Sequence, residues 1–485
     1  VNWKIIGHVF DSYPLPGFDK PQHGNGVWAP SLRYHDGLFY VYFGDPDNGI
    51  FMATAKNPAG PWSPLHLVKQ SKGWIDTCPL WDDDGKAYLV HAFANSRAGV
   101  KDMLAICRMS PDGTSLLDEG TLVVDGRNNK WPTVEGPKLY KHNGYYYILA
   151  PAGGVTGGYQ MAYRSKNILG PYDAKKVMDQ GTTPINGPHQ GGWVTTQTGE
   201  DWFMHFQDKG PYGRVVHLEP MKWVNDWPVI GEDPDGDGTG QPVLTYKMPD
   251  VGATYPPEQP QTSDDFSSKT LGLQWQWPAN PNPDFYSLTA RRGWIRLNTQ
   301  PLPAGGKNLW DAPNLLLQKL PADEFKMIAD VDVSGLNDGE RAGVVVMGQD
   351  YATLYVQRSG QDYNLCLGVA KDAINGKPEV ATKLLDLDPK IATRHVLRLM
   401  IYVQPGGVCR FSFADRDDAQ AWDDRTDVPF PQTFQAKMGR WIGAKVGIYA
   451  SGQTTSGGHA DFDNVIFVDQ KPVLGKVNPA TRNAP

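Results

Sequence analysis

Two carboxylic acids, an imidazole and two indoles stand just before four similar hairpin sequences in the first half of the chain. The acids are Asp76 and Glu135, the imidazole is His189, and the indoles are Trp28 and Trp74. Paired carboxyl groups around a pocket suit hydrolysis of a glycosidic bond, because one protonates the departing oxygen while another activates water or attacks the sugar. Each acid alone could equally cap a turn or lie in an exposed loop. Their shared position in successive repeats favours a common site.

The four hairpin sequences are the elements that must position these side chains. They occupy residues 30–44, 79–93, 137–151 and 193–206, each as a short strand, a tight turn and an aromatic-rich strand. Three of the turns are Asp-Gly or Asn-Gly, the dipeptides that fit a two-residue type I′ turn. A hairpin about every 50 residues is typical of the blades of a β-propeller. Residues 1–245 therefore predict about five blades, the fifth divided between the two ends of the propeller.

The chain divides into two all-β domains. Residues 1–250 are expected to form a five-bladed propeller whose first strand region is missing. A Pro-, Thr- and Gln-rich stretch without periodicity predicts a linker at 251–263. Short β-rich runs over 264–475 predict a β-sandwich of the jelly-roll type, followed by a tail at 476–485.

Composition and charge exclude several classes of protein. The chain has 46 Lys and Arg against 53 Asp and Glu, a net charge of −7, whereas nucleic-acid binders show a basic excess. No run approaches the ~18 apolar residues of a membrane span. The four cysteines are far apart and form no C-x-x-C pair, which argues against a zinc cage or a disulfide framework and leaves a single disulfide open.

Several phrases of the first half resemble glycoside hydrolase family 43, the five-bladed enzymes that act as β-xylosidases and α-L-arabinofuranosidases. They read G-V-W-A-P at 26–30, W-I-D-T-C-P-L-W-D-D-D-G-K-A-Y-L-V at 74–90, V-E-G-P-K-L-Y-K-H-N-G-Y-Y-Y-I-L-A-P-A-G-G at 134–154, A-Y-R-S at 162–165 and G-R-V-V-H-L-E-P-M-K-W at 213–223. The second half resembles the concanavalin-A-like sandwich that follows the propeller in many members, at 272–277, 332–344, 441–449 and 460–465. The resemblance covers nearly the whole chain.

The resemblance implies an inverting reaction with three acids: an Asp that acts as general base, a second Asp that tunes the pKa of the general acid, and a Glu that is the general acid. Asp76 of I-D-T-C-P-L matches the tuning Asp, and Glu135 of V-E-G-P matches the acid. An ionised carboxylate beside the acid makes the loss of its proton more costly. His189 matches a histidine beneath the active site near the channel axis, and Arg214 matches an arginine that faces the substrate hydroxyls; a buried structural histidine and an ordinary strand arginine are the alternatives. The other candidates for substrate binding are Trp28 and Trp74, for which core packing is the alternative.

The general base is the residue that the sequence lacks. The resemblance places it in a Y-P-D-P-like motif upstream of a segment similar to residues 1–9. The similar run at 13–16 reads Y-P-L-P and follows that segment, and neither Asp11 nor Asp19 in the same loop is proposed instead. We therefore expect this chain to hydrolyse glycosides poorly or not at all unless it is extended upstream of Val1.

No cofactor is required for the chemistry that the resemblance implies. Asp264 and Asp463 could share a structural Ca²⁺, as in similar sandwiches, although capped strand ends would look the same in sequence. Residues 233–238, D-P-D-G-D-G, resemble the first half of an EF-hand loop. The twelfth position of that loop is Leu244 instead of Glu, which favours a surface turn.

The sequence thus predicts an exo-acting glycosidase that releases xylose or arabinofuranose from plant hemicellulose. Its expected partners are xylan, arabinoxylan, arabinan or xyloglucan side chains, without nucleic acid and without a membrane span. A secreted or periplasmic location is expected, although no signal peptide is visible in this sequence. The alternatives are an endo-arabinanase and a non-catalytic carbohydrate-binding propeller, in which the two acids would be unimportant.

Overall fold

The computed structural model describes residues 3–389, 396–416, 428–452 and 457–471. The chain forms two compact units. The first consists of Val1–Phe10, Asn25–Asp208 and Arg214–Gln259, and the second of Asp11–Gly24, Lys209–Gly213 and Pro260–Pro485. The division at 259/260 falls inside the predicted linker, and the predicted tail at 476–485 lies outside the described residues.

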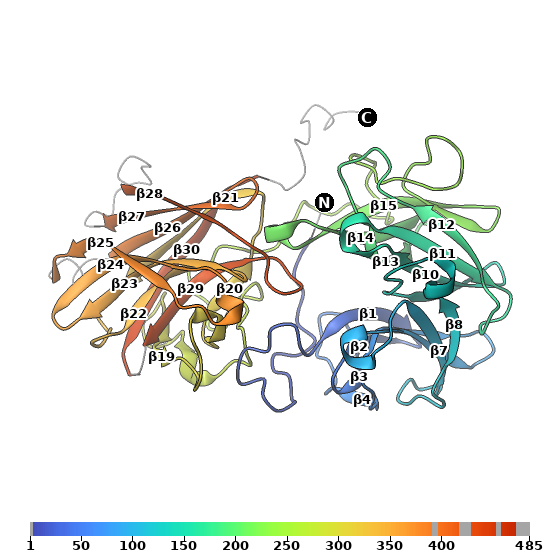
Figure 1. Cartoon of the computed structure of the whole chain (residues 1–485), viewed down its shortest axis with the longest axis horizontal. Helices are drawn as coiled ribbons and strands as arrows, with labels where there is room; N and C mark the ends of the chain where they lie inside the picture. The colour runs from blue at the N-terminus through green and yellow to red at the C-terminus, as the bar shows by residue number, and fades with distance from the viewer. Residues whose placement is uncertain (1–2, 390–395, 417–427, 453–456, 472–485) are drawn as a thin grey trace. The chain divides into compact units, whose positions relative to one another are not determined.

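The first unit contains four antiparallel sheets of four strands each, which follow one another from blue to green in Figure 1. The first sheet is β1 (Trp28–His35), β2 (Leu38–Asp45), β3 (Gly49–Ala55) and β4 (His66–Lys69). The second is β5 (Trp74–Trp81), β6 (Ala87–Phe93), β7 (Met103–Met109) and β8 (Thr121–Asp125). The third is β9 (Lys138–His142), β10 (Tyr145–Ala152), β11 (Tyr159–Ser165) and β12 (Asp173–Met178). The fourth is β13 (His189–Thr195), β14 (Asp201–Asp208), β15 (Arg214–Val224) and β16 (Trp227–Ile230).

Apolar side chains between neighbouring sheets hold this propeller-like arrangement together. Tyr42, Met52 and Leu89 pack between the first and second sheets. Equivalent clusters lie between the second and third sheets and between the third and fourth. The helices of this unit are single turns within loops, at α1 (Asn95–Ala98), α2 (Gly126–Asn129) and α3 (Gly154–Gly157).

Two of the three predicted type I′ turns form. Both central residues have positive φ at Asp36-Gly37 (45° and 81°) and at Asn143-Gly144 (47° and 70°). The Asp84-Gly85 prediction is wrong, because Gly85 alone is left-handed there and the turn is closed further out, by Asp82 N–H donating to Lys86 O at 2.8 Å. A longer loop between Trp81 and Ala87 therefore replaces the tight turn.

No fifth sheet divided between the two ends of the propeller exists among the described residues. The segments in question meet without forming strands: Trp3 N–H donates to Glu258 O at 3.2 Å, and Lys4 pairs with Glu258 at 3.7 Å. The architecture shown by the described chain is therefore four blade-like sheets followed by a sandwich.

The second unit is the predicted β-sandwich. One sheet has the order β17 (Tyr286–Ser287), β18 (Ile295–Asn298), β30 (His459–Lys471), β21 (Glu324–Asp332), β26 (Val396–Gln404), β27 (Val408–Arg416) and β28 (Val428–Gln435). The other has the order β19 (Gln300–Pro301), β29 (Lys445–Gly452), β22 (Arg341–Met347), β23 (Tyr351–Ser359), β24 (Asp362–Ala370) and β25 (Val380–Leu387), with β20 (Leu316–Lys319) also paired to β29. Alternate residues of both sheets, among them Phe325, Val344 and Phe462, fill one core. Single 3₁₀ turns are η1 (Gly210–Tyr212), η2 (Pro283–Phe285), η3 (Leu309–Asp311) and η4 (Ala373–Asn375).

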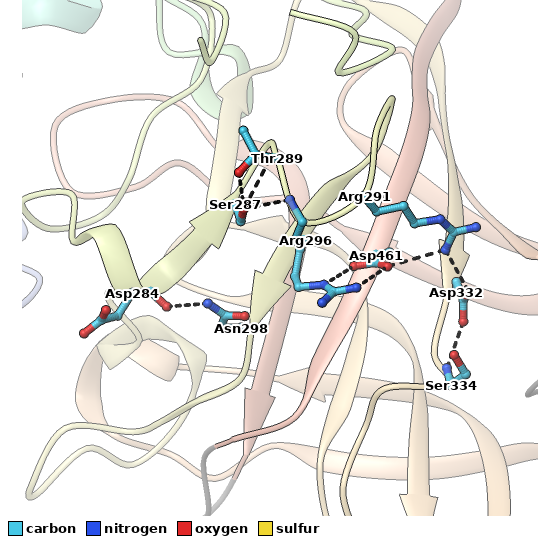
Figure 2. A network of polar contacts seen from close by, with 10 residues as sticks. Asp284, Ser287, Thr289, Arg291, Arg296, Asn298, Asp332, Ser334 and Asp461 are labelled. Atoms are coloured by element: carbon cyan, nitrogen blue, oxygen red, sulfur yellow. Dashed lines mark hydrogen bonds and ion pairs between the residues drawn. The ribbon is translucent and has the colours of Figure 1, made fainter. Parts of the chain in front are cut away.

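Charged side chains on the outer face of the first of these sheets pair with one another. Figure 2 shows Arg296 of β18 and Arg291 of the preceding loop converging on Asp461 of β30. Arg291 also donates to Asp332 of β21 at 2.8 Å. These acids therefore hold neighbouring strands together.

Two segments that the sequence assigned to the propeller belong to the second unit. Tyr13 and Asn280 exchange two hydrogen bonds of 2.8 Å, and His23 stacks on Trp310 at 3.8 Å. The Tyr212 hydroxyl donates to Asp323 O at 2.8 Å.

No helix in the described part of the chain is long and apolar enough to cross a membrane. The four cysteines, Cys78, Cys107, Cys366 and Cys409, are buried and form no disulfide.

Candidate active site

One backbone feature recurs at the entry to the first strand of the sheets. A β-bulge shifts the register between Trp28 and Ser31, between Ile75 and Cys78, and between His189 and Gly192. A residue with positive φ stands at each bulge, Ala29 at 30°, Asp76 at 58° and Gln190 at 52°, and Gly136 at 62° precedes β9. A bulge re-aims the side chains of its strand, and left-handed backbone at non-glycine residues costs about 1–3 kcal/mol and clusters at functional sites.

These bulges bring Asp76 of the second sheet to residues of the third and fourth. Asp76 is 2% exposed. Its Oδ2 accepts a hydrogen bond from the backbone N–H of Gly136 at 2.8 Å and another from Nε2 of Gln190 at 3.1 Å. Gly136 carries no side chain here for a steric reason, because a Cβ would lie 2.7 Å from the Gln190 amide. Asp76 is thus a buried carboxylate held by two donors from other sheets.

Glu135 is the more accessible member of the acid pair. Its side chain is 30% exposed, and His189 Nε2 lies 2.8 Å from its Oε1. His189 itself is 1% exposed, at the first position of β13. The backbone N–H of Glu135 donates to Pro151 O at 3.3 Å. A buried imidazole therefore orients a carboxyl group that reaches solvent, the arrangement that proton donation to a bound molecule requires.

The two acids are electrostatically linked. Burial raises the pKa of Asp76 above its ordinary value, and the neighbouring Glu135 raises it further. Lys138 and the hydrogen bonds from Gly136 and Gln190 act in the opposite direction. Glu135 is therefore close enough to Asp76 for its charge to make ionisation of Asp76 more costly.

Trp74 and Trp28 each begin the first strand of a sheet and are half-buried. Trp74 stacks on His91 with ring centroids 3.9 Å apart and an angle of 12°. Burial lowers the pKa of His91 to about 4, so a neutral ring supports Trp74. Trp28 lies under the guanidinium of Arg97, whose Cζ is 5.7 Å from the indole centre. Each indole is therefore fixed from one side by another side chain.

Arg214 stands at the same end of the fourth sheet as His189. Phe206 pairs in register with His189, and their rings lie 5.6 Å apart. Arg214 is exposed, and its guanidinium Cζ lies over the same Phe206 ring, 4.7 Å from the ring centre. The structure thus brings Glu135 and His189 into contact and bonds Asp76 to the residues that follow them, Gly136 and Gln190. Arg214 contacts the Phe206 ring, which also lies beside His189.

The predicted calcium ligands lie in the second unit. Asp264 Oδ1 accepts from Phe266 N–H at 2.9 Å, and Oδ2 accepts from Trp275 Nε1 at 2.9 Å and Gln274 Nε2 at 3.3 Å. Asp463 accepts two hydrogen bonds from Asn464. Ca²⁺ needs six to eight oxygen ligands, and protein donors already occupy Asp264, so the residues fit capped strand ends better than an ion. The Ca²⁺ site stays a prediction, which a chelator-dependent change in melting temperature would test.

Asp233, Asp235 and Asp237 form an acidic group in the first unit, with carboxylate oxygens within 4.8 Å of one another. Asp233 accepts hydrogen bonds from the backbone N–H groups of Gly236 and Gly238, both at 2.9 Å. The loop is therefore closed by its own side chain.

Sequence reasoning missed the residues that support the acids. Gln190 follows His189 in P-H-Q-G-G, Gly136 follows Glu135, and Lys138 comes two residues later. The sequence could have indicated these three residues, because each lies in a motif already identified as the entry to a hairpin. His91 and Arg97 carried no such signal, since their partners are distant in sequence.

The profile of glycosyl hydrolases family 43 matches residues 1–228, and that of the beta xylosidase C-terminal concanavalin A-like domain matches residues 263–467. The chain belongs to family 43. Its relatives include a putative beta-xylosidase of Xylanibacter ruminicola, 43% identical over 77% of this chain and 66% of that protein. A beta-xylosidase of Formosa agariphila is 32% identical over 96% of this chain and 82% of its own length. A non-reducing end alpha-L-arabinofuranosidase of Bacteroides ovatus is 32% identical over 77% of this chain and 71% of its own length.

Solved structures agree with the fold of this family 43 chain. The crystal structure of a xylan beta-1,4-xylosidase from Bacillus halodurans matches with a TM-score of 0.78 and 23% identity, over 92% of this chain and 87% of that one. The predictions of a glycosidase and of a concanavalin-A-like second domain are confirmed at the level of the family.

Proposed function

We propose that this family 43 chain provides the acid half of an exo-acting glycosidase that releases xylose units from hemicellulose, with Glu135 as general acid and Asp76 as its tuning carboxylate. The observation that carries the proposal is the linked pair itself. Glu135 is partly exposed and hydrogen-bonded to His189, while Asp76 is buried behind it with two protein donors. A glycosidic oxygen must be protonated as its bond breaks, and we propose that Glu135 supplies that proton.

Hydrolysis also requires a group that activates water. The contacts and charges at Asp76 come from Gly136, Gln190, Glu135 and Lys138. Asp11 and Asp19, the acids beside the Y-P-L-P run, belong to the second unit. We therefore propose none of these residues as the general base.

β-Xylosidase is the first choice because two of the three relatives above bear that name. α-L-Arabinofuranosidase is the second candidate, because the Bacteroides ovatus relative bears that name at 32% identity. We further propose xylan, arabinoxylan, arabinan and xyloglucan side chains as the substrate range, and a secreted or periplasmic location, which cell fractionation would test.

We also propose a fifth blade in the complete propeller. On β1, Arg33 points toward Cys78 of the next sheet, so Leu32 and Tyr34 point away from it. They are 51% and 64% exposed. On the fourth sheet, Val194 and Val216 are 49% and 54% exposed. Two apolar faces at the ends of a row of sheets suit an additional sheet packed against both. Binding of a hydrophobic dye to this chain that falls when the chain is extended upstream of Val1 would support the proposal; equal binding would contradict it.

The function is tested with the full-length protein on aryl β-xyloside, aryl α-arabinofuranoside and xylo-oligosaccharides. We expect single xylose units from the chain end, and no hydrolysis by the Glu135→Gln variant with binding of xylo-oligosaccharide retained. Glu119→Gln, at an exposed acid paired with Lys69, is the matched control and should remain active. Turnover unchanged in Glu135→Gln would favour the non-catalytic carbohydrate-binding alternative, and internal cleavage of the polymer would favour an endo-acting enzyme.

A further inference from the structure

Two side-chain amides, those of Gln207 and Asn186, link the third and fourth sheets by hydrogen bonds. Gln207 lies on β14 and is 4% exposed. Its Nε2 donates to Pro184 O at 2.9 Å and to Asn186 Oδ1 at 2.7 Å. Asn186 in turn donates from Nδ2 to Thr156 O at 2.8 Å. Since Thr156 belongs to α3, between β10 and β11, these two amides connect the fourth sheet to a loop of the third.

The backbone carbonyl groups at the two ends fix the direction of both amides. Pro184 O and Thr156 O can only accept, so each must face an NH₂ group. Gln207 therefore uses both hydrogens of Nε2 as donors, and its Oε1 faces His217 Nε2 at 3.3 Å. A carboxylate at position 186 would keep the acceptor for Gln207 and place an oxygen against Thr156 O. Position 186 thus requires an amide, because only an amide both accepts from Gln207 and donates to Thr156.

The loop that Asn186 holds is rich in glycine. Residues 153–158 read G-G-V-T-G-G, and glycine loses more backbone freedom on folding than any other residue. No side chain caps the start of α3. Gly187, next to Asn186, lets the two segments approach each other, because a Cβ there would lie 2.2 Å from Val155 O. Contacts with Asn186 and Gly187 therefore help to fix a loop that has little rigidity of its own.

The beginning of this loop is bonded to the segment that carries Glu135. The backbone N–H of Gly153 donates to Pro132 O at 2.7 Å. The backbone N–H of Glu135 donates to Pro151 O at 3.3 Å. A displacement of residues 153–158 therefore reaches the backbone of Glu135.

The other end of the link leads to His189. Asn186 stands three residues before His189, which begins β13, and the two residues between them are buried. His189 Nε2 lies 2.8 Å from Glu135 Oε1, so a second bond joins the same two sheets. The contacts form a closed circuit, from Glu135 through the loop to Asn186 and back through His189. Because the circuit is closed, the distance between Glu135 and His189 depends on the bond from Asn186 to the loop.

We propose that Asn186 is a positioning residue, which holds loop 153–158 to the segment before His189 and so sets the distance between the Glu135 carboxyl group and the His189 imidazole. The catalytic consequence rests on the function proposed above for Glu135. Two bonds in one closed circuit support each other, because each reduces the conformational freedom that the other must restrict. Without the Asn186 donor the loop moves more freely, and His189 orients Glu135 for a smaller fraction of the time.

Hydrogen exchange measured by NMR tests the positioning in this chain without any need for activity. Asn186→Asp keeps the shape of the side chain and removes its donor. We expect the backbone amides of Gly153 and Glu135 to exchange at least about tenfold faster in this variant than in the wild type, because the loop opens more often. Asn298→Asp is the matched control, since Asn298 of β18 donates to Asp284 O at 3.0 Å in the second unit. It should leave both rates unchanged.

The catalytic consequence is measured as kcat on xylobiose in the chain extended upstream of Val1. Wild type, Asn186→Asp, His189→Leu and the double variant are compared. We expect Asn186→Asp to lower kcat about tenfold with KM nearly unchanged, and to lower it less than about twofold in the His189→Leu background. A residue that merely stabilised the fold would lower kcat equally in both backgrounds.

Asn186→Ala, which removes the donor without adding a charge, replaces Asn186→Asp in both experiments if the latter folds poorly. Faster exchange confined to residues 154–158, with the Glu135 amide unchanged, would overturn the proposal, and so would equal losses of kcat in the two backgrounds. A wild type that hydrolyses neither xylosides nor arabinofuranosides would refute the proposed function alone, since hydrogen exchange measures the positioning of Glu135 without activity.

Discussion

Gly136→Ala is the substitution whose effect can be worked out most completely. Gly136 has φ of 62°, where an alanine costs about 1–2 kcal/mol. Its new Cβ would lie 2.7 Å from Cδ and Oε1 of Gln190, so the flexible amide must move. That movement breaks the 3.1 Å hydrogen bond from Gln190 to Asp76, and a hydrogen bond to a charged group contributes about 1.5–3 kcal/mol.

The expected result is a kcat reduced about 10- to 100-fold with little change in KM, because 1.4 kcal/mol corresponds to about tenfold in rate and Gln190 acts on Asp76. Steady-state kinetics of the full-length protein on aryl β-xyloside provide the measurement. Gly37→Ala is the matched control: Gly37 has φ of 81° and a Cβ there meets nothing within 4 Å. It should lose stability to a similar extent and keep its kcat.

The loss of kcat caused by Gly136→Ala should disappear when the Gln190 side chain has already been shortened. Gly136→Ala added to Gln190→Ala should lower kcat no further than Gly37→Ala does. A kcat for Gly136→Ala equal to that of Gly37→Ala would refute the account of how the Gly136 peptide and Gln190 hold Asp76.

Two further predictions concern stability and substrate binding. Burial and Glu135 raise the pKa of Asp76 above its ordinary value of 3.8. The folded state therefore binds the Asp76 proton more tightly than the unfolded state does. As the pH rises through the unfolded-state and then the folded-state pKa of Asp76, ionisation of this buried group lowers the free energy of unfolding. Asp76→Asn should therefore raise the melting temperature at pH 7, with a gain that shrinks toward pH 4; a gain independent of pH would contradict the sign. Arg97→Met should raise KM about threefold to tenfold with a smaller change in kcat, because Arg97 fixes Trp28 and pairs with Asp47 at 3.1 Å, and a cation–π contact contributes about 0.5–1 kcal/mol. Arg127→Met, which removes a comparable exposed pair with Asp125, should leave KM unchanged.

The strands and the acid pair could be predicted from sequence because both depend on local patterns. Asp36-Gly37 and Asn143-Gly144 select their turns by the φ that they tolerate, and Asp76 and Glu135 recur at one place in successive hairpins. The Asp84-Gly85 turn could not be predicted, because Asp82 closes a wider loop there. Contacts such as Gln190 with Asp76 depend on bulges that rotate side chains between sheets, and a one-residue register shift leaves no periodic trace. Residues 11–24 belong to the second unit because Tyr13 bonds to Asn280 and His23 stacks on Trp310. These partners are distant in sequence, so no local pattern predicts them.

The dependence of hydrolysis on the leaving group tests the role of Glu135 most directly. The full-length protein and its Glu135→Gln variant are compared on a xyloside with an acidic dinitrophenol leaving group and on xylobiose, whose leaving oxygen must be protonated. If Glu135 is the general acid, the substitution slows xylobiose hydrolysis by about 100-fold or more and the dinitrophenyl substrate far less. Equal losses on both substrates would contradict the assignment.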